Sequence, residues 1–289
     1  MLKTVWLTEN TDITNGCAML LGGFDGLHIG HRQLLACAKE SGFPVGLMTI
    51  VGGKTDGSLF TFAERESIFK NSGADFVFEL PFEEIKDLSP EEFLRKLIAE
   101  FNPKLFVCGE DFRFGKGAVG TPEAIKQATR VRVEVLPLVE KEGEKVSSRT
   151  IKGLLASGDV ECANALLSEP FFLVGKVEKD RQVGRTIGFP TANICYPSEK
   201  FPLKLGVYET YALVDGKEYK GITNYGARPT FGNEKVVTET YFEGFHGDLY
   251  GQTLEIRFVR YLRDIQKFQS VEELKTQLQK DILRLTMGE

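Results

Sequence analysis

The amino-acid sequence predicts two domains: an α/β domain with a parallel sheet in residues 1–168, and a mainly-β domain in residues 169–289. A chain of 289 residues is more often two domains than one. Up to residue 168, apolar runs typical of buried strands alternate with helical segments, which favours a parallel sheet covered on both faces. From Phe171 onward the predicted strands are short and bounded by turns, which favours a closed antiparallel barrel with a C-terminal helix.

The composition is that of an ordinary soluble globular protein, with 42% hydrophobic and 27% charged residues. The net charge of −5 argues against a nucleic-acid partner held by a basic surface. No apolar run reaches a membrane-spanning length, and residues 1–4 open no signal peptide, so we expect a cytoplasmic protein without a membrane partner. The five cysteines are scattered and include no Cys-x-x-Cys pair, which favours buried thiols in a reducing compartment over a zinc site.

In the first domain, residues that commonly begin helices follow the apolar runs. Thr61–Glu64 and Ser89–Glu92 have the pattern of capping boxes, and Thr121-Pro122 opens a further helix. Residues 154–167 are expected to form short helices that break at Ser157-Gly158-Asp159. The strands of the predicted parallel sheet are 18–22, 45–50, 75–80, 104–108 and 131–136.

A glycine-rich turn follows the first of these strands. Gly22, Gly23 and Gly26 end the apolar run, and a helical pattern begins near Leu27. Spaced three apart, His28 and His31 would share one face at the N-terminus of that helix, where unpaired amides and the positive end of the dipole attract phosphate. Gly30 carries no side chain and leaves room for a nucleotide.

The turn fits neither of two common phosphate-binding patterns. It has no Gly-x-Gly-x-x-Gly and no following Gly-Lys-Ser/Thr, so a dinucleotide-binding or a Walker loop is excluded. The simplest alternative is a pair of histidines without a binding role. Two of the three histidines in the chain lie in this four-residue stretch, which favours a functional pair.

The turn resembles the His-x-Gly-His motif of nucleotidyltransferases, in the form Gly-Gly-Phe-Asp-Gly-Leu-His-Ile-Gly-His found in prokaryotic FAD synthetases. The resemblance implies a Rossmann-like nucleotidyltransferase domain, in which His28 and His31 donate hydrogen bonds to ATP phosphates during adenylyl transfer to FMN. It places Gly23, Phe24, Asp25 and Gly30 at the nucleotide site.

Two later stretches extend this resemblance. Residues 108–117 are similar to the family's Gly-x-Asn/Asp-Phe-Arg-Phe-Gly loop, which implies binding roles for Asp111 and Arg113. Residues 146–152 are similar to the Ser-Ser-Thr-x-Ile-Arg motif that holds the triphosphate. This similarity implies binding roles for Ser147, Ser148 and Lys152, although either serine could simply cap the following helix.

Three departures from the family pattern bear on this activity. Arg149 replaces Thr, Lys152 replaces Arg, and residues 49–57 lack the usual Phe-x-Pro-His-Pro. A lysine holds phosphate as a single point charge instead of a planar fork. We therefore expect adenylyl transfer to be the slower of two activities, with FMN accumulating before FAD.

The second domain has the pattern of an antiparallel barrel. Asp215-Gly216 between two alternating runs predicts a hairpin. A final helix over 270–285 begins with a capping box at Ser270 and carries an apolar stripe that includes Val271 and Ile282. The predicted strands are 171–178, 206–213, 218–224, 236–242 and 254–260.

Four blocks of this domain, in order, resemble riboflavin kinase: 184–193, 224–231, 239–241 and 248–251. The resemblance implies that Glu239 is the catalytic base and that Thr191 and Asn193 hold Mg²⁺ with ATP, Asn193 also taking part in catalysis. It also implies flavin- or nucleotide-binding roles for Gly184, Arg185, Gly188, Pro190, Asn224, Arg228 and Thr230. Ile265 stands where the family tends to have Glu.

Together the two resemblances imply a bifunctional enzyme that phosphorylates riboflavin to FMN and adenylylates FMN to FAD, with ATP as co-substrate in both steps. Its expected partners are small molecules only, and the sequence leaves the oligomeric state open. Two alternatives remain. One is a monofunctional riboflavin kinase with a degenerate first domain, and the other is a non-catalytic flavin-binding or regulatory protein.

Overall fold

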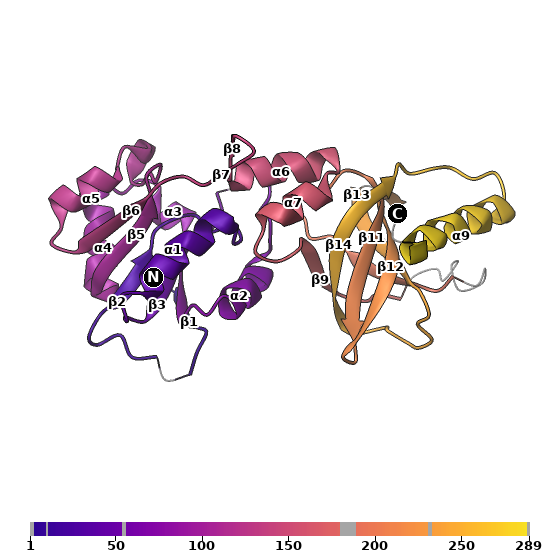
Figure 1. Cartoon of the computed structure of the whole chain (residues 1–289), viewed down its shortest axis with the longest axis horizontal. Helices are drawn as coiled ribbons and strands as arrows, with labels where there is room; N and C mark the ends of the chain where they lie inside the picture. The colour runs from indigo at the N-terminus through magenta and orange to yellow at the C-terminus, as the bar shows by residue number, and fades with distance from the viewer. Residues whose placement is uncertain (1–2, 10, 54–55, 180–188, 231–232, 288–289) are drawn as a thin grey trace. The chain divides into compact units, whose positions relative to one another are not determined.

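The computed structural model describes residues 3–9, 11–53, 56–179, 189–230 and 233–287. The chain divides into two compact units (Figure 1). The first unit comprises Met1–Thr150 and Leu166–Ser168, and the second comprises Ile151–Ala165 and Glu169–Glu289. Among the described residues, no helix combines the length and the apolar character needed to cross a membrane.

The first unit is built on a six-stranded sheet with the order β1-β4-β3-β2-β5-β6. The five strands predicted from the sequence are present and pair in parallel. A further strand, β1, pairs antiparallel with β4 at the edge of the sheet and was not predicted. The bounds are β1 (Lys3–Trp6), β2 (Cys17–Leu20), β3 (Val45–Val51), β4 (Phe76–Pro81), β5 (Pro103–Gly109) and β6 (Arg132–Leu136).

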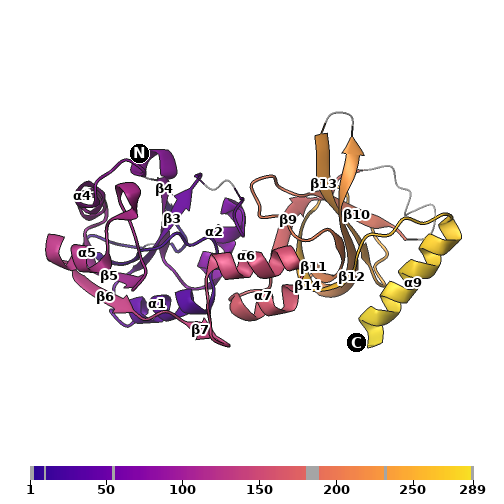
Figure 2. The same ribbon diagram turned by 90° about the horizontal axis from the view of Figure 1, so that it is seen from above.

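Helices cover this sheet on both faces because alternate residues of each strand point to opposite sides. On one face, Met19, Phe78 and Phe106 pack with Phe93 and Leu97 of α4. On the other face α1 packs along β2, β3 and β5, and Figure 2 shows α1 and α4 on opposite sides of the strands. The helices are α1 (Ile29–Lys39), α2 (Phe62–Asn71), α3 (Phe82–Ile85), α4 (Pro90–Phe101) and α5 (Pro122–Ala128).

The helix starts predicted from the sequence are confirmed. Thr61 and Ser89 form complete capping boxes with Glu64 and Glu92. Thr121 caps α5, with Pro122 in its first turn. The short two-stranded hairpin of β7 (Glu140–Lys141) and β8 (Glu144–Lys145) was not predicted.

The strand order creates a crevice above β2. The chain leaves β2 toward β3 on one side and later returns as β5 on the other side. At such a switch point the loops that follow the two central strands diverge, and ligands bind between them. The turn after β2 and the loop after β5 are therefore placed to form a site.

Two short helices follow β8, namely α6 (Ser148–Ser157) and α7 (Val160–Leu166), as the sequence predicts. Gly158 separates them with φ of +89°, a conformation that favours glycine. The second half of α6 packs within the second unit, where the amide of Lys204 donates to the carbonyl of Leu155 at 3.2 Å.

The second unit is an antiparallel barrel with the strand order β10-β13-β12-β11-β14-β9. Beyond the end of β9, the amide of Glu178 donates to the carbonyl of Asn193 in β10 at 2.8 Å, which joins the two edges. Figure 2 shows the strands curving around the core. The bounds are β9 (Phe172–Lys176), β10 (Thr191–Cys195), β11 (Gly206–Val214), β12 (Lys217–Thr230), β13 (Asn233–Phe242) and β14 (Thr253–Arg263).

The predicted hairpin and final helix are both confirmed, although Val271 of the predicted apolar stripe is exposed. Asp215 and Gly216 have φ of +50° and +78° between β11 and β12, as the two-residue turn requires. Helix α9 (Val271–Met287) packs on the barrel through Leu285, beside Val207 and Ile222.

Candidate active sites in the two units

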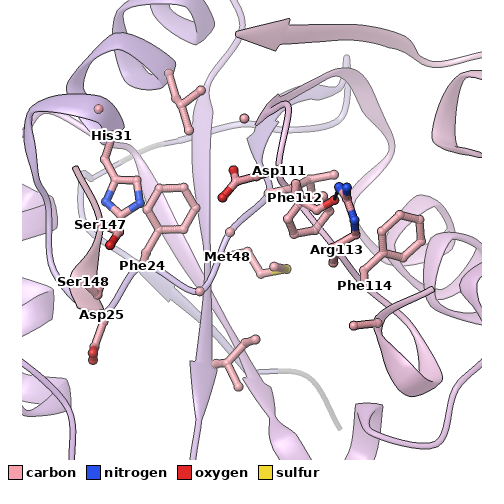
Figure 3. Close-up of a pocket in the computed structure, with 18 of the residues that line it drawn as sticks. Phe24, Asp25, His31, Met48, Asp111, Phe112, Arg113, Phe114, Ser147 and Ser148 are labelled. Carbon is pink, nitrogen blue, oxygen red and sulfur yellow. Dashed lines mark hydrogen bonds between the residues drawn. The ribbon is translucent and has the colours of Figure 1, made fainter. Parts of the chain in front are cut away.

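A cavity of about 660 Å³ lies at the switch point of the first unit. Three segments line it: the turn after β2, the loop after β5, and the residues that lead from β8 into α6. Figure 3 shows Phe24, His31 and Ser147 on one side of the cavity and Asp111, Phe112, Arg113 and Phe114 on the other, with Met48 between them. The structure thus brings together residues from all three motifs of the first domain.

His28 and His31 both line the cavity, and backbone groups fix their rings. His28 is the N-cap of α1, and its Nδ1 accepts a hydrogen bond from the amide of His31 at 3.3 Å. The Nδ1 of His31 lies 3.0 Å from the carbonyl oxygen of Gly26. The two rings stack, with their centroids 3.5 Å apart. Burial lowers the pKa of His28 to about 4, so its ring is neutral at pH 7.

Gly30 has a second reason to be glycine besides room for a nucleotide. It lines the cavity, and a Cβ added to it would lie 3.2 Å from Nδ1 of His28. That is tighter than nine in ten contacts of real Cβ atoms. A side chain at this position would therefore require the histidine ring to shift by a few tenths of an ångström.

The side chains of Phe24 and Asp25 are buried beneath the turn after β2. Phe24 has φ of +31°, which is unusual for a residue with a side chain, and its buried ring lies 4.6 Å from the ring of His31. The buried carboxylate of Asp25 faces the guanidinium of Arg65, which donates to Thr49 Oγ1 at 2.7 Å. Burial lowers the pKa of Arg65, and the charge of Asp25 opposes that shift.

The loop after β5 contributes a charged and an aromatic wall. Asp111 forms an ion pair with Lys145 of β8, and both side chains line the cavity. Arg113 is exposed, and its Nη1 donates to the carbonyl of Phe112 at 2.8 Å. The rings of Phe112 and Phe114 stack 5.5 Å apart, which gives this side of the cavity an apolar surface.

The two serines before α6 have different surroundings. Ser147 caps the helix, since its Oγ accepts from the amide of Thr150 at 3.2 Å and lies 2.9 Å from Thr150 Oγ1. That threonine hydroxyl donates in turn to the carbonyl of Lys145 at 2.8 Å. Ser148 also lines the cavity, and no hydrogen bond of its hydroxyl occurs within the described part of the chain. Its hydroxyl is therefore available to a ligand.

Lys152, which the motif places beside the triphosphate, does not line the cavity in this structure. It is buried in the second unit, with Nζ 5.2 Å from the centre of the Phe201 ring. Two lysines that sequence reasoning did not single out line the cavity: Lys145, and Lys86, whose ammonium pairs with Glu83.

The candidate kinase residues of the second unit gather on the outer surface of the barrel. Asn193 of β10 lies opposite Glu239 of β13, which lies opposite Asn224 of β12. Interior positions of these strands are taken by buried residues such as Ala192 and Thr240, so the alternation places this row outside. The Nδ2 of Asn193 donates to Thr191 Oγ1 at 3.3 Å, which adds Thr191 to the row.

Of the other residues in the kinase motifs, some lie in the described part of the second unit and others do not. The Phe189 ring packs edge-on against Tyr241 at 5.4 Å, which joins two of the four motif blocks, and Pro190 beside it is exposed. Ile265 approaches Gly226, where an added Cβ would lie 3.1 Å from its Cδ1. Arg228 and Thr230 lie in β12, and Gly184, Arg185 and Gly188 fall outside the described residues.

Comparisons with known proteins match both units. The model of the FAD synthetase family matches residues 10–150, and the model of the riboflavin kinase family matches residues 167–286. A bifunctional riboflavin kinase/FMN adenylyltransferase from Bacillus subtilis is 32% identical, covering 91% of this chain and 89% of that protein. One from Pseudomonas fluorescens is also 32% identical, covering 92% of this chain and 91% of that protein.

A solved structure agrees along the same length. The crystal structure described as a macrolide-efflux protein from Streptococcus pneumoniae superposes with a TM-score of 0.86 at 30% identity. The superposition covers 96% of this chain and 95% of that one. Given this identity across both units, the chain belongs to the family of bifunctional riboflavin kinase/FMN adenylyltransferases.

Proposed function

We propose that the cavity of the first unit transfers AMP from ATP to FMN and releases pyrophosphate, while the outer row of the barrel phosphorylates riboflavin with ATP. The observation that carries the proposal is the convergence of His28, His31, Lys145 and Ser148 on one cavity, in a chain whose two units match the two families. Riboflavin, FMN and ATP are thus the substrates. All five cysteines are free thiols, which supports the cytoplasmic location expected from the sequence.

The adenylyl transfer needs alignment and charge stabilisation more than a base. The phosphate of FMN is already ionised at neutral pH, so it can attack the α-phosphate of ATP without losing a proton. The N-termini of α1 and α6 both border the cavity and provide amide donors. Lys145 adds a positive charge, and His28 donates from Nε2 because its Nδ1 is occupied as an acceptor.

The opposite side of the same cavity suits the flavin ring. Met48, Phe82 and Phe112 line it with apolar surface. Phe82 packs closely over Gly53, where a Cβ would lie 2.5 Å from the phenylalanine ring. In this chain, therefore, an aromatic side chain lies beside the segment that lacks the family's Pro-His-Pro. An apolar wall facing a cationic one matches a substrate with a flat ring at one end and a phosphate at the other.

Substitution of Lys145 tests which lysine holds the triphosphate. We expect Lys145→Met to raise KM for ATP in FAD formation about ten- to hundredfold, the usual effect of losing a charged hydrogen bond. Steady-state kinetics with FMN as substrate measures it. Lys152→Met is the matched control and should change this KM little, because Lys152 lies over Phe201. A large effect of Lys152→Met alone, in a folded variant, would place that lysine at the triphosphate instead.

The kinase reaction makes a different demand, because the attacking group is an alcohol. Its proton must leave as the oxygen attacks the γ-phosphate, and the carboxylate of Glu239 is the candidate base. Asn193 lies between Glu239 and Thr191 and can orient the hydroxyl.

The residues of this row also fit a magnesium ion. Thr191 carries a hydroxyl and Asn193 an amide oxygen, and both are hard oxygen ligands of the kind that Mg²⁺ prefers while it keeps waters and phosphate oxygens. The amide nitrogen of Asn193 lies 3.3 Å from Thr191 Oγ1, so the two side chains are neighbours. Bound with ATP, the ion would neutralise charge on the phosphates.

A time course with riboflavin, ATP and Mg²⁺ tests the whole proposal. We expect FMN to appear first and FAD after a lag, because FMN is the product of the first reaction and the substrate of the second. Chromatographic separation of the flavins measures both products. FMN without FAD at any time would favour the monofunctional kinase. Flavin binding without either product would favour a regulatory protein.

A further inference from the structure

The backbone fixes the two cavity histidines as different tautomers. The amide of His31 can only donate, so Nδ1 of His28 is an acceptor and its ring proton sits on Nε2. The carbonyl oxygen of Gly26 can only accept, so Nδ1 of His31 carries the proton and its Nε2 is a lone pair. One histidine therefore offers the cavity a donor, and the other offers it an acceptor.

We propose that His31 takes up a proton from solvent when the triphosphate of ATP enters the cavity. This inference rests on the proposed role of the cavity as the ATP site. Ionised phosphates carry only acceptor oxygens, so a lone pair at Nε2 of His31 would repel them. Protonation turns Nε2 into a charged donor and leaves the Nδ1 hydrogen bond to Gly26 in place.

The charges around the pair explain why the proton arrives only with the ligand. In the free protein, burial and then the neighbouring His28 lower the pKa of His31 well below its ordinary value. For His28, burial lowers the pKa, while Asp111 raises it and Lys145 lowers it. The positive end of α1 acts on both rings in the same direction as burial. Several negative charges of a triphosphate reverse this balance.

Only one of the two rings gains the proton. Their centroids are 3.5 Å apart, so two imidazolium ions would repel each other strongly. His28 needs no extra proton, because its neutral tautomer already donates from Nε2. His31 is the ring that must change.

Nitrogen NMR of the histidine rings tests this directly in the full-length protein. The chain has only three histidines, and His246 is the third, so ring ¹⁵N labelling gives few signals. Single substitutions to Asn at positions 28 and 31 and to Gln at 246 assign them. The probe is magnesium with α,β-methylene ATP, which binds without transferring its adenylyl group. Spectra above pH about 7.5 keep the terminal phosphate ionised throughout.

In the free protein, we expect a His28 ring protonated on Nε2 and a His31 ring protonated on Nδ1. At saturating analogue, His31 should carry protons on both nitrogens and His28 should keep its single proton. Raising the pH should weaken binding at this cavity, up to about tenfold per pH unit while the complex holds one proton more than the free protein.

Two outcomes would overturn the inference, and they differ in what they say of the proposed function. If the analogue shifts both ring signals while His31 stays singly protonated, ATP binds in the cavity but the proton uptake does not occur. If neither ring responds to saturating analogue, the cavity is not the ATP site, and the proposed function of the first unit fails as well.

Discussion

A variant with Asn in place of both His28 and His31 should lose FAD formation while it still converts riboflavin to FMN. Asn is a favoured N-cap, so His28→Asn keeps the start of α1 while it removes the Nε2 donor. Asn at position 31 can still donate to the carbonyl of Gly26 but no longer reaches a phosphate. Removing a donor of this kind lowers kcat by about 10²–10³.

The measurement is the rate of each product from its own substrate. FAD formation is followed from FMN and ATP, and FMN formation from riboflavin and ATP. Because the histidine pair lies in the first unit and Glu239 lies in the second, an intact kinase rate shows that the second unit is undisturbed, and thermal unfolding of the variant checks the fold of the first unit. If the variant has the same unfolding temperature as the parent protein but loses both rates equally, the proposal that the two reactions use separate sites is wrong.

Most of the first unit could be predicted because its strands are long apolar runs between clear helix starts. The five parallel strands and the caps at Thr61, Ser89 and Thr121 follow from local sequence. Strand β1 has only the four residues Lys3–Trp6, and its pairing with β4 comes from tertiary structure. Strand β10, which was not predicted either, has five residues, and its place is set by its pairing with β13.

Some residues of the candidate sites could likewise be predicted from local sequence, whereas others are placed only by tertiary structure. The spacing of His28 and His31 at a helix start predicts that their rings share a site, since residues three apart on a helix are neighbours. Lys145 is one of several alternating Lys and Glu residues in 140–145, and only the turn of the β7–β8 hairpin selects it for the cavity. The position of Lys152 depends on Phe201, 49 positions further along, which no local pattern reveals.

In the second unit, the row of Asn193, Glu239 and Asn224 depends on strand register. Each residue belongs to a different motif block, and the sequence gives no distance between them. The register of β10, β13 and β12 places them directly opposite one another. A shift of one residue in either pairing would turn the carboxylate into the barrel. The proposed kinase site thus depends on the register of these three strands.

Replacement of Glu239 by Gln should therefore abolish most of the kinase rate without weakening the fold. Gln keeps the size and the hydrogen-bonding groups of Glu but cannot accept the proton of the ribityl hydroxyl. General-base catalysis contributes about 10²–10⁴ to a rate, so we expect kcat for FMN formation to fall by that factor. KM for ATP should change little, because the proposed contacts to Mg²⁺ and ATP are Thr191 and Asn193.

Glu243→Gln is the matched control for this substitution. Glu243 is the next carboxylate along the chain, and it accepts a hydrogen bond from the hydroxyl of Tyr241 at 3.2 Å. It lies beyond the end of β13, outside the row opposite Asn193. We expect Glu243→Gln to keep the parent kcat, and both variants to convert supplied FMN to FAD normally. A Glu239→Gln protein that phosphorylated riboflavin at the parent rate would show that another group accepts the proton.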